Sequence, residues 1–258
     1  MVHAADPSHP RYESLLKRAM LEEAQKKGML ANSAMIAHGR GEAFDYLIGE
    51  QTTESAEMAT REAAARLVSA NSCIISVNGN VAALASEEIL KCASILECDL
   101  EVNIFYRTPE RMQAILDHVT MCKEKLLQMD DVGLSDGWKE RLSNVRVLGS
   151  SPDARIPGLE GPRANCHSDG IISADTILVP LEDGDRCEAL VAMGKEVIVV
   201  DLNPLSRSAQ RATVTIVDEL TRCASNLIQI LNDDVASPNL DWDNEENLRC
   251  ALNDMHVK

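Results

Sequence analysis

The chain has 258 residues, 45% of them hydrophobic, and a formal net charge of −16 at pH 7. A chain of this length buries a substantial core, so we expect one large α/β domain or one domain with an appendage. The acidic balance argues against non-specific nucleic-acid binding, which depends on a basic surface, and no apolar run approaches the roughly 20 residues needed to span a membrane.

The first 70 residues are predicted to form a helical region. They begin without a basic stretch followed by a hydrophobic one, so we expect no secretion signal and a cytoplasmic protein. After a first helix, residues 31–38 are expected to be a connector. The motif His38-Gly39-Arg40-Gly41 is expected to be a loop that leads into a short helix. Thr52 or Thr53 should cap a longer helix to about Ser69.

Repeated strand–helix units follow, which predicts an α/β fold with a mainly parallel sheet flanked by helices. Thr108 should cap the helix that starts at Pro109, and Asp218 the helix that runs to about Leu231. Pro152–Arg163 has three prolines and two glycines and should lack regular structure. The predicted strands are Ser72–Val77, Leu100–Phe105, Val145–Leu148, Thr176–Pro180, Val197–Val200 and Ala212–Val217.

These patterns divide the chain into three parts. Residues 1–70 are expected to form the helical region, and residues 71–232 a core of repeated strand–helix units. Residues 233–258 form an acidic C-terminal extension, which we expect to be loosely held and to contain a short helix at Glu245–Leu252. The eight cysteines form no CxxC pair, which predicts reduced structural thiols and no zinc site.

The stretch Ala174–Arg207 is expected to organise the ligand site. Its two apolar runs are separated by about one helix, as in a βαβ unit with parallel strands. Polar loops follow both runs, at Glu182–Arg186 and Asp201–Arg207. Ligands of open α/β sheets bind outside the carboxyl ends of the strands, so we expect a phosphorylated ligand beside these loops.

Common phosphate-binding signatures are missing from the sequence. There is no GxxxxGK[ST] motif, since Gly194-Lys195 is followed by glutamate, and no GxGxxG after a strand. A P-loop NTPase and a standard NAD dehydrogenase are therefore disfavoured. No GxSxG motif suggests a hydrolase, and the histidines show no metal spacing.

Four segments could still hold an anion, and each has a simpler explanation. Asn78-Gly79-Asn80 offers a flexible backbone at a helix start, or is an ordinary turn. Arg40 could bind phosphate, or form a salt bridge with Glu42 or Asp45. The segment from Glu182 to Arg186 could bind a ribose or a hydrated metal ion, or cap a helix. The segment from Asn203 to Arg207 could bind an anion or form a proline turn.

Seven segments of the chain together resemble archaeal phosphopantothenate synthetase, also called 4-phosphopantoate–β-alanine ligase. The resemblance runs from about Ser8 to Leu231, whereas Cys122–Asn144 looks longer than usual and the segment after Asp233 looks like an addition. The segments are SHPRYESLLKR, IAHGRGEAFDYLIGE, ISVNGNVAAL, LEVNIFYRT, DARIPGLEGPRA, VPLEDGDRCEALVAMGK and DLNPLSRSAQ.

The resemblance implies a homodimeric enzyme of coenzyme A synthesis with a Rossmann-like core and a helical part. It implies that ATP, 4-phosphopantoate and β-alanine become 4′-phosphopantothenate, AMP and pyrophosphate. The family's ATP-binding positions carry over onto Arg18 and Arg40. The matching loops extend the expected ATP site to Glu182, Asp183, Gly184, Asp185, Arg186, Asp201, Leu202, Asn203, Ser206 and Arg207.

We expect an acyl-adenylate route in which arginines and Mg²⁺ neutralise converging anions. Arg18 and Arg40 would hold the triphosphate, and Arg155 on the irregular loop would act as a lid cation. The motifs assign no general base, metal ligand or β-alanine pocket. Residues that end neighbouring strands would lie near the phosphopantoate, namely Asn78, Asn80, Asn103, Tyr106 and Arg107.

Two other functions would suit the same scaffold. A nicotinamide-dependent oxidoreductase is disfavoured by the missing GxGxxG motif, and NAD binding would identify it. A non-catalytic sensor would bind ATP without cleaving it, so pyrophosphate release separates a sensor from a ligase.

Overall fold

Short apolar runs form a six-stranded parallel sheet in the order β3-β2-β1-β6-β7-β8, in the computed structural model, which describes residues 6–255. Each neighbouring pair in this order is parallel, as predicted from the alternation of strands and helices. The strands are β1 (Cys73–Val77), β2 (Asp99–Val102), β3 (Val147–Leu148), β6 (Thr176–Pro180), β7 (Glu196–Val200) and β8 (Val214–Ile216).

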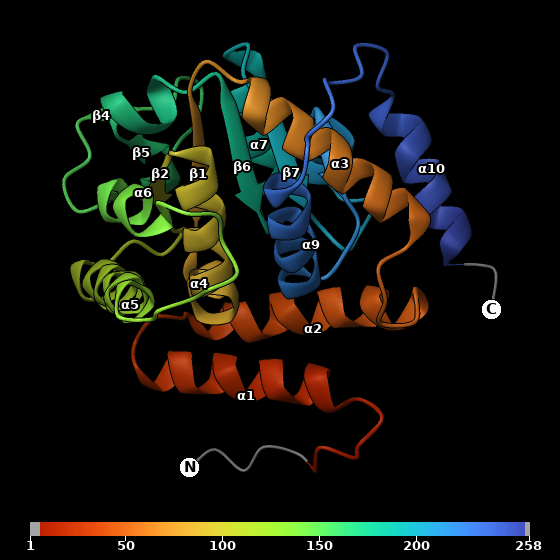
Figure 1. Ribbon diagram of the computed structural model, residues 1–258, viewed down its shortest axis with the longest axis horizontal. Helices are drawn as coiled ribbons and strands as arrows, with labels where there is room; N and C mark the ends of the chain where they lie inside the picture. The colour runs from red at the N-terminus through yellow and green to blue at the C-terminus, as the bar shows by residue number, and fades with distance from the viewer. Residues whose placement is uncertain (1–5, 256–258) are drawn as a thin grey trace.

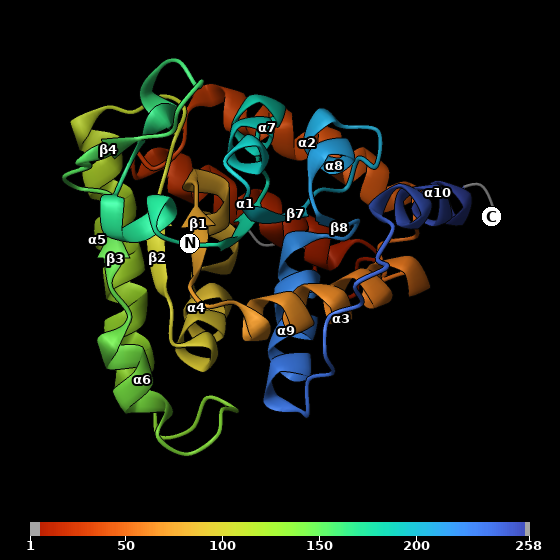
Figure 2. The ribbon, with the colours of Figure 1, turned by 90° about the horizontal axis from the view of Figure 1, so that it is seen from above.

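Side chains alternate between the two faces of the sheet and are buried on both, which is typical of parallel sheets. Ile75 and Leu178 join the larger core, whereas Ile74 and Ile177 join the core on the other face. Helices α3, α4 and α9 cover the first face, with α5 and α6 packed beside α4, and α7 and α8 cover the second (Figure 2). Their bounds are α3 (Glu54–Ser69), α4 (Gly79–Leu96), α5 (Pro109–Leu127), α6 (Trp138–Asn144), α7 (Gly184–Ala192), α8 (Arg207–Arg211) and α9 (Leu220–Asn232).

Two N-terminal helices close the end of the sheet at which the strands finish. Helix α2 (Asn32–Leu47) crosses below the sheet in Figure 1, and α1 (Tyr12–Lys26) lies beneath α2. Gly28, with φ of +77°, ends the α1 segment in the left-handed conformation that glycine favours. Among residues 6–255, no helix is both long and apolar enough to cross a membrane.

The structure corrects the prediction for residues 31–41. The expected connector and the loop at His38–Gly41 are both parts of the continuous helix α2. Two glycines lower the intrinsic preference of this segment for a helix, but packing against other elements can outweigh such a preference. Gly41 faces Leu202, since a Cβ atom at Gly41 would lie 3.5 Å from Leu202 Cδ1, so a small residue lets α2 cross close to the sheet.

Three boundary predictions are also wrong. Strand β2 ends at Val102 instead of Phe105, and Glu219, not Asp218, caps α9 through bonds from the amides of Thr221 and Arg222. The proline-rich segment is not wholly irregular, because β4 (Ala154–Arg155) pairs antiparallel with β5 (Asn165–Cys166). The turns η1 (Pro162–Ala164) and η2 (Ser168–Ile172) flank β5. The predicted caps Thr53 and Thr108 are confirmed.

The C-terminal segment is packed against the core, contrary to the expected loose attachment. Helix α10 (Asn244–Asp254) buries Leu248 and Ala251 against Ala209 and Val217. The Asn244 side chain also bonds the backbone of Thr215 at the edge strand. These contacts give the acidic segment a fixed place beside β8.

Candidate functional site

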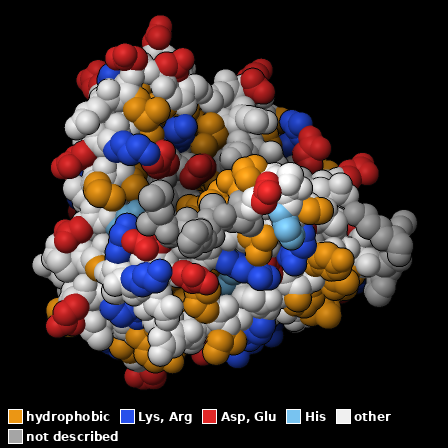
Figure 3. All heavy atoms as spheres, turned by 90° about the horizontal axis from the view of Figure 1, so that it is seen from below, with side chains coloured by type: hydrophobic (Ala, Val, Ile, Leu, Met, Phe, Trp, Pro, Cys, Tyr) orange, Lys and Arg blue, Asp and Glu red, His pale blue; other side chains and the backbone are white. Residues whose placement is uncertain are grey.

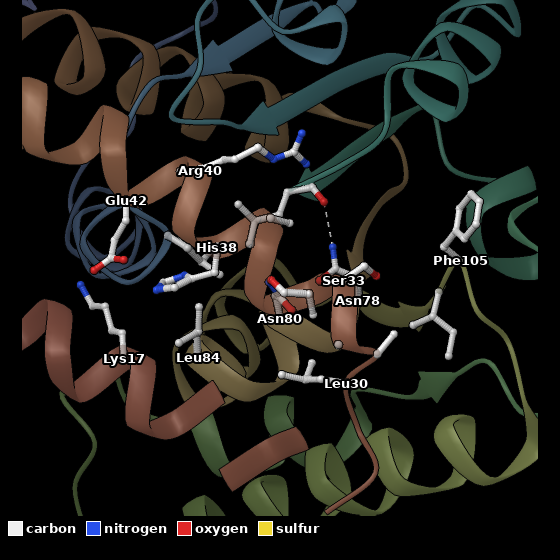
Figure 4. A pocket seen from close by; sticks show the side chains of 18 of the residues that line it. Lys17, Leu30, Ser33, His38, Arg40, Glu42, Asn78, Asn80, Leu84 and Phe105 are labelled. Atoms are coloured by element: carbon white, nitrogen blue, oxygen red, sulfur yellow. Dashed lines mark hydrogen bonds between the residues drawn. The ribbon is translucent and has the colours of Figure 1, made fainter. Parts of the chain in front are cut away.

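A pocket of about 400 Å³ lies between α2 and the carboxyl ends of the strands. Here the chain leaves β1 for one side of the sheet and β6 for the other, so the pocket sits at a topological switch point. Figure 4 shows Lys17, Glu42 and His38 at one end of the pocket and Phe105 at the other. Arg40 and the start of α4 lie between these ends.

The start of α4 gives the pocket a wall of backbone donors. Asn78 caps the helix by accepting a bond from the Val81 amide at 3.1 Å, and its Nδ2 donates to the Leu181 carbonyl at 3.0 Å. A Cβ atom at Gly79 would lie 2.8 Å from Leu30 Cδ2 and 3.0 Å from the Met29 carbonyl oxygen, so glycine allows the close approach of the α1–α2 connection. The amino end of this long helix favours a negatively charged ligand.

Cationic side chains approach the same wall. Arg40 forms no hydrogen bond or ion pair with any residue from 6 to 255, although it lines the pocket. Arg111 donates to the carbonyls of Tyr106 at 2.5 Å and Met29 at 3.3 Å, while its buried Nε has no partner in the described chain. These groups make this part of the pocket suited to phosphate.

The loop after β6 is held by a buried cluster of ions. Glu182 pairs with Arg163 on one side and with the fully buried Arg186 on the other. Burial alone would raise the pKa of Glu182, but the charges of Arg186 and Arg163 outweigh it and lower that pKa below its ordinary value. Of the predicted segment Glu182–Arg186, only Asp183 lines the pocket, beside Arg163. Glu182 and Arg186 therefore stabilise the conformation of the loop through buried ion pairs and do not face the pocket.

The other residues of the two predicted loops have structural partners. Arg207 pairs with Asp185 and lies against Gly184, where a Cβ atom would come within 2.6 Å of Arg207 Nε. Asp201 accepts bonds from the Asn203 amide at 2.9 Å and the Ser206 hydroxyl at 2.5 Å, and its burial raises its pKa. Leu202 alone of the segment Asp201–Arg207 lines the pocket.

The remaining predicted residues separate into two groups. Asn78, Asn80 and Tyr106 line the pocket together with Arg40. Four others do not belong to the pocket lining. Among these, Arg18 forms a two-pronged pair with Glu42, with Nη2 2.8 Å from Oε2, beside the pocket. Asn103 is buried and donates to the carbonyls of Arg163 and Asn165, Arg107 bonds the Gly149 carbonyl, and Arg155 bonds Asn165 Oδ1 at 2.6 Å.

Several lining residues were not assigned to the site from the sequence. Lys17 is paired with Glu219 at 2.6 Å across 202 positions of sequence, a contact that no local pattern reveals. Arg111 and Arg163 come from a helix start and from the end of the proline-rich segment. His38 belongs to a motif that the sequence singled out, and its place in the wall is explained by the helical form of that motif.

The face that α1 forms is of mixed charge, and the described residues hold no preformed metal site. The face formed by α1 carries positive and negative side chains with apolar groups between them (Figure 3). Within residues 6–255, no group of three or more His, Cys, Asp or Glu side chains could hold a metal ion. A nucleotide-bound Mg²⁺ needs only one or two protein carboxylates, and Asp183 is such a group at the pocket.

Comparison with known proteins gives consistent matches. The model of the phosphopantothenate/pantothenate synthetase family matches residues 55–257, so the C-terminal segment lies inside the matched region and is not an addition to it. The 4-phosphopantoate–β-alanine ligase of Thermococcus kodakarensis is 49% identical over 86% of this chain and 78% of its own length. Proteins of the same name from Methanospirillum hungatei and Methanosarcina mazei are each 48% identical over 85% of this chain, covering 82% and 78% of their own lengths.

Proposed function

This chain belongs to the phosphopantothenate/pantothenate synthetase family, and from that premise we propose that it joins 4-phosphopantoate to β-alanine at the expense of ATP. The products are 4′-phosphopantothenate, AMP and pyrophosphate. The observation that carries the proposal is a phosphate-suited pocket at the switch point, in a chain that is 49% identical, over 86% of its length, to a ligase of that name. We further propose a cytoplasmic homodimer.

The two phosphorylated substrates share the central part of the pocket in this proposal. The phosphate of 4-phosphopantoate lies at the start of α4, where Asn80 and Arg111 add donors to the backbone. The triphosphate lies beside Arg40, and the nucleotide reaches Leu202. Asp183 would hold a Mg²⁺ ion that arrives with the phosphates, and the ion would help to neutralise their charge. Arg18 joins the site if the nucleotide displaces it from Glu42.

The reaction follows from bringing these groups together. The pantoate carboxylate attacks the α-phosphorus, forms an acyl-adenylate and releases pyrophosphate. The amine of β-alanine then attacks the acyl carbon and releases AMP. Positioning and the neutralisation of three anionic groups supply most of the catalysis, because fixed cations need no reorganisation when the charge moves.

Product analysis tests the proposal. The protein is incubated with ATP, Mg²⁺ and 4-phosphopantoate, with and without β-alanine. We expect AMP and an amide product of the correct mass only with the full substrate set, whereas without β-alanine pyrophosphate should form no more than once per active site. Formation of ADP and phosphate instead would still indicate a ligase, but it would contradict an acyl-adenylate intermediate. ATP binding without turnover would indicate a nucleotide sensor and contradict the proposal.

A further inference from the structure

The end of the pocket against α1 carries charges of both signs. We call it the amine end and define it by Ser14, Lys17, His38, Glu42 and Glu219. Lys17 Nζ lies 2.6 Å from Glu219 Oε2, and Glu42 accepts a bond from Ser14. A short zwitterion, with one ammonium and one carboxylate, matches such a pair of opposite charges.

His38 differs from the other residues of the amine end because its ring forms no hydrogen bond with the described residues. Neither ring nitrogen has a hydrogen-bond partner among residues 6–255, and Nε2 is buried. Figure 4 shows the ring directed toward Lys17 and Glu42. Burial lowers the pKa of His38 below its ordinary value. The positive charges of Arg18 and Lys17 on α1 also lower this pKa, whereas the negative charges of Glu42 and Glu219 raise it by less than the lowering effects. The ring is therefore neutral at pH 7, which leaves one nitrogen free to take a proton.

The amine end also borders a second cavity. This polar cavity, of about 560 Å³, lies between the start of α1, the end of α2 and the start of α9. Ser14, Lys17 and Asp45 line both cavities, so their side chains form the partition. Among the described residues, only these side chains separate the amine end from the second cavity, which lies outside the region proposed for the nucleotide.

We propose that the amine end is the subsite for the β-amino acid and that the imidazole of His38 accepts the proton its ammonium must lose. The inference rests on the proposed function and extends its second step. The ammonium gives one proton to His38, and the freed electron pair of nitrogen bonds to the acyl carbon of the adenylate. The carbon–oxygen bond to the AMP phosphate breaks with its electron pair on AMP, which takes the second proton from nitrogen.

The variant His38→Gln tests this role. Glutamine keeps a polar group of similar reach but cannot accept the proton. Exchange of labelled pyrophosphate into ATP, with 4-phosphopantoate and no amine, measures adenylate formation. A chase of the adenylate with β-alanine measures the second step, and a chase with hydroxylamine supplies a nucleophile that is already unprotonated at neutral pH.

We expect the β-alanine chase of His38→Gln to slow about 10²- to 10⁴-fold at pH 7, a typical contribution of a general base. The hydroxylamine chase and the exchange should fall far less. The matched control is His118→Gln, at a half-buried histidine of α5 outside the pocket. An equal loss in all three reactions, or no loss with β-alanine, would overturn the role of His38. A wild type without exchange would overturn the proposed function itself.

A wild-type measurement keeps the inference testable if the variant does not fold. With His38 as the base, the β-alanine chase levels off above the pKa of His38, which lies below 6.5. Without a base, the rate would climb about tenfold per pH unit toward the pKa of a free amine, near 10. That continuous climb would overturn the inference.

Discussion

At the scale of single residues, Arg40 is the cation most available to a ligand. It lines the pocket and has no partner within residues 6–255, whereas Arg18 is already paired with Glu42. Replacing Arg40 with alanine should raise the apparent KM for ATP by about 10- to 100-fold, because charge-assisted bonds contribute about 1.5–3 kcal/mol.

Steady-state kinetics at saturating 4-phosphopantoate and β-alanine measures this effect. The control is Arg61→Ala, which removes an exposed arginine that pairs with Glu57 on α3. An Arg40→Ala enzyme with the KM of the control would remove Arg40 from the nucleotide site.

The residues of the site were predictable where a loop follows a strand directly. Asn78, Asn80 and Asp183 follow strand ends, and all three line the pocket. Glu182 and Arg186 are also polar residues that follow a strand, yet their side chains are buried against each other. A run of charges cannot tell which members face a ligand, because that depends on Arg163, about 20 positions away.

At the scale of elements, the cluster of Glu182, Arg163 and Arg186 ties the loop after β6 to the segment before β5. Glu182→Gln leaves two arginines buried with weakened partners. We expect a loss of about 3–5 kcal/mol in the free energy of unfolding, as for other broken buried pairs. Urea unfolding measures it, with the exposed Glu57→Gln as the control, and equal stabilities would show that the cluster is not a stabilising one.

The same carboxylate makes stability depend on pH. The folded state lowers the pKa of Glu182 below 4.5, so its contribution is complete above pH 4.5 and disappears as the pH falls through the lowered value. The stability difference between wild type and Glu182→Gln should therefore shrink below pH 4.5. Urea unfolding at several pH values tests this, and a constant difference would contradict it.

Helix α10 contributes to stability through a small apolar contact. Leu248 is 5% exposed in its contact with Ala209 and Val217. Leu248→Ala should cost about 2–5 kcal/mol of unfolding free energy and leave KM unchanged, because α10 does not line the pocket. Leu240→Ala, at a leucine that is 94% exposed, is the matched control. Equal unfolding curves for the two variants would support the loose attachment expected from the sequence.

Helix α2 shows where sequence patterns fail at this scale. Its glycines and its many small side chains give it little amphipathic character, so residues 31–41 were predicted as connector and loop. The segment is helical because it closes the end of the sheet, a constraint that exists only in the folded chain. The correction matters for function, since it places His38 and Arg40 on one rigid element.

At the scale of the whole molecule, the order of strands and helices predicts the architecture well. Apolar runs of four to six residues between amphipathic segments indicate a parallel sheet, and the switch point then locates the pocket. The part of the pocket that α1 and α2 form was not predictable, because these helices lie far from the strands in sequence.

The central claim is that the carboxylate of 4-phosphopantoate is activated as an acyl-adenylate in this pocket. The most direct test uses 4-phosphopantoate labelled with ¹⁸O in the carboxylate, together with ATP, Mg²⁺ and β-alanine, and mass spectrometry of the products. We predict one ¹⁸O atom in the AMP phosphate for each amide formed. Amide formation with unlabelled AMP, or with the label in inorganic phosphate, would contradict it.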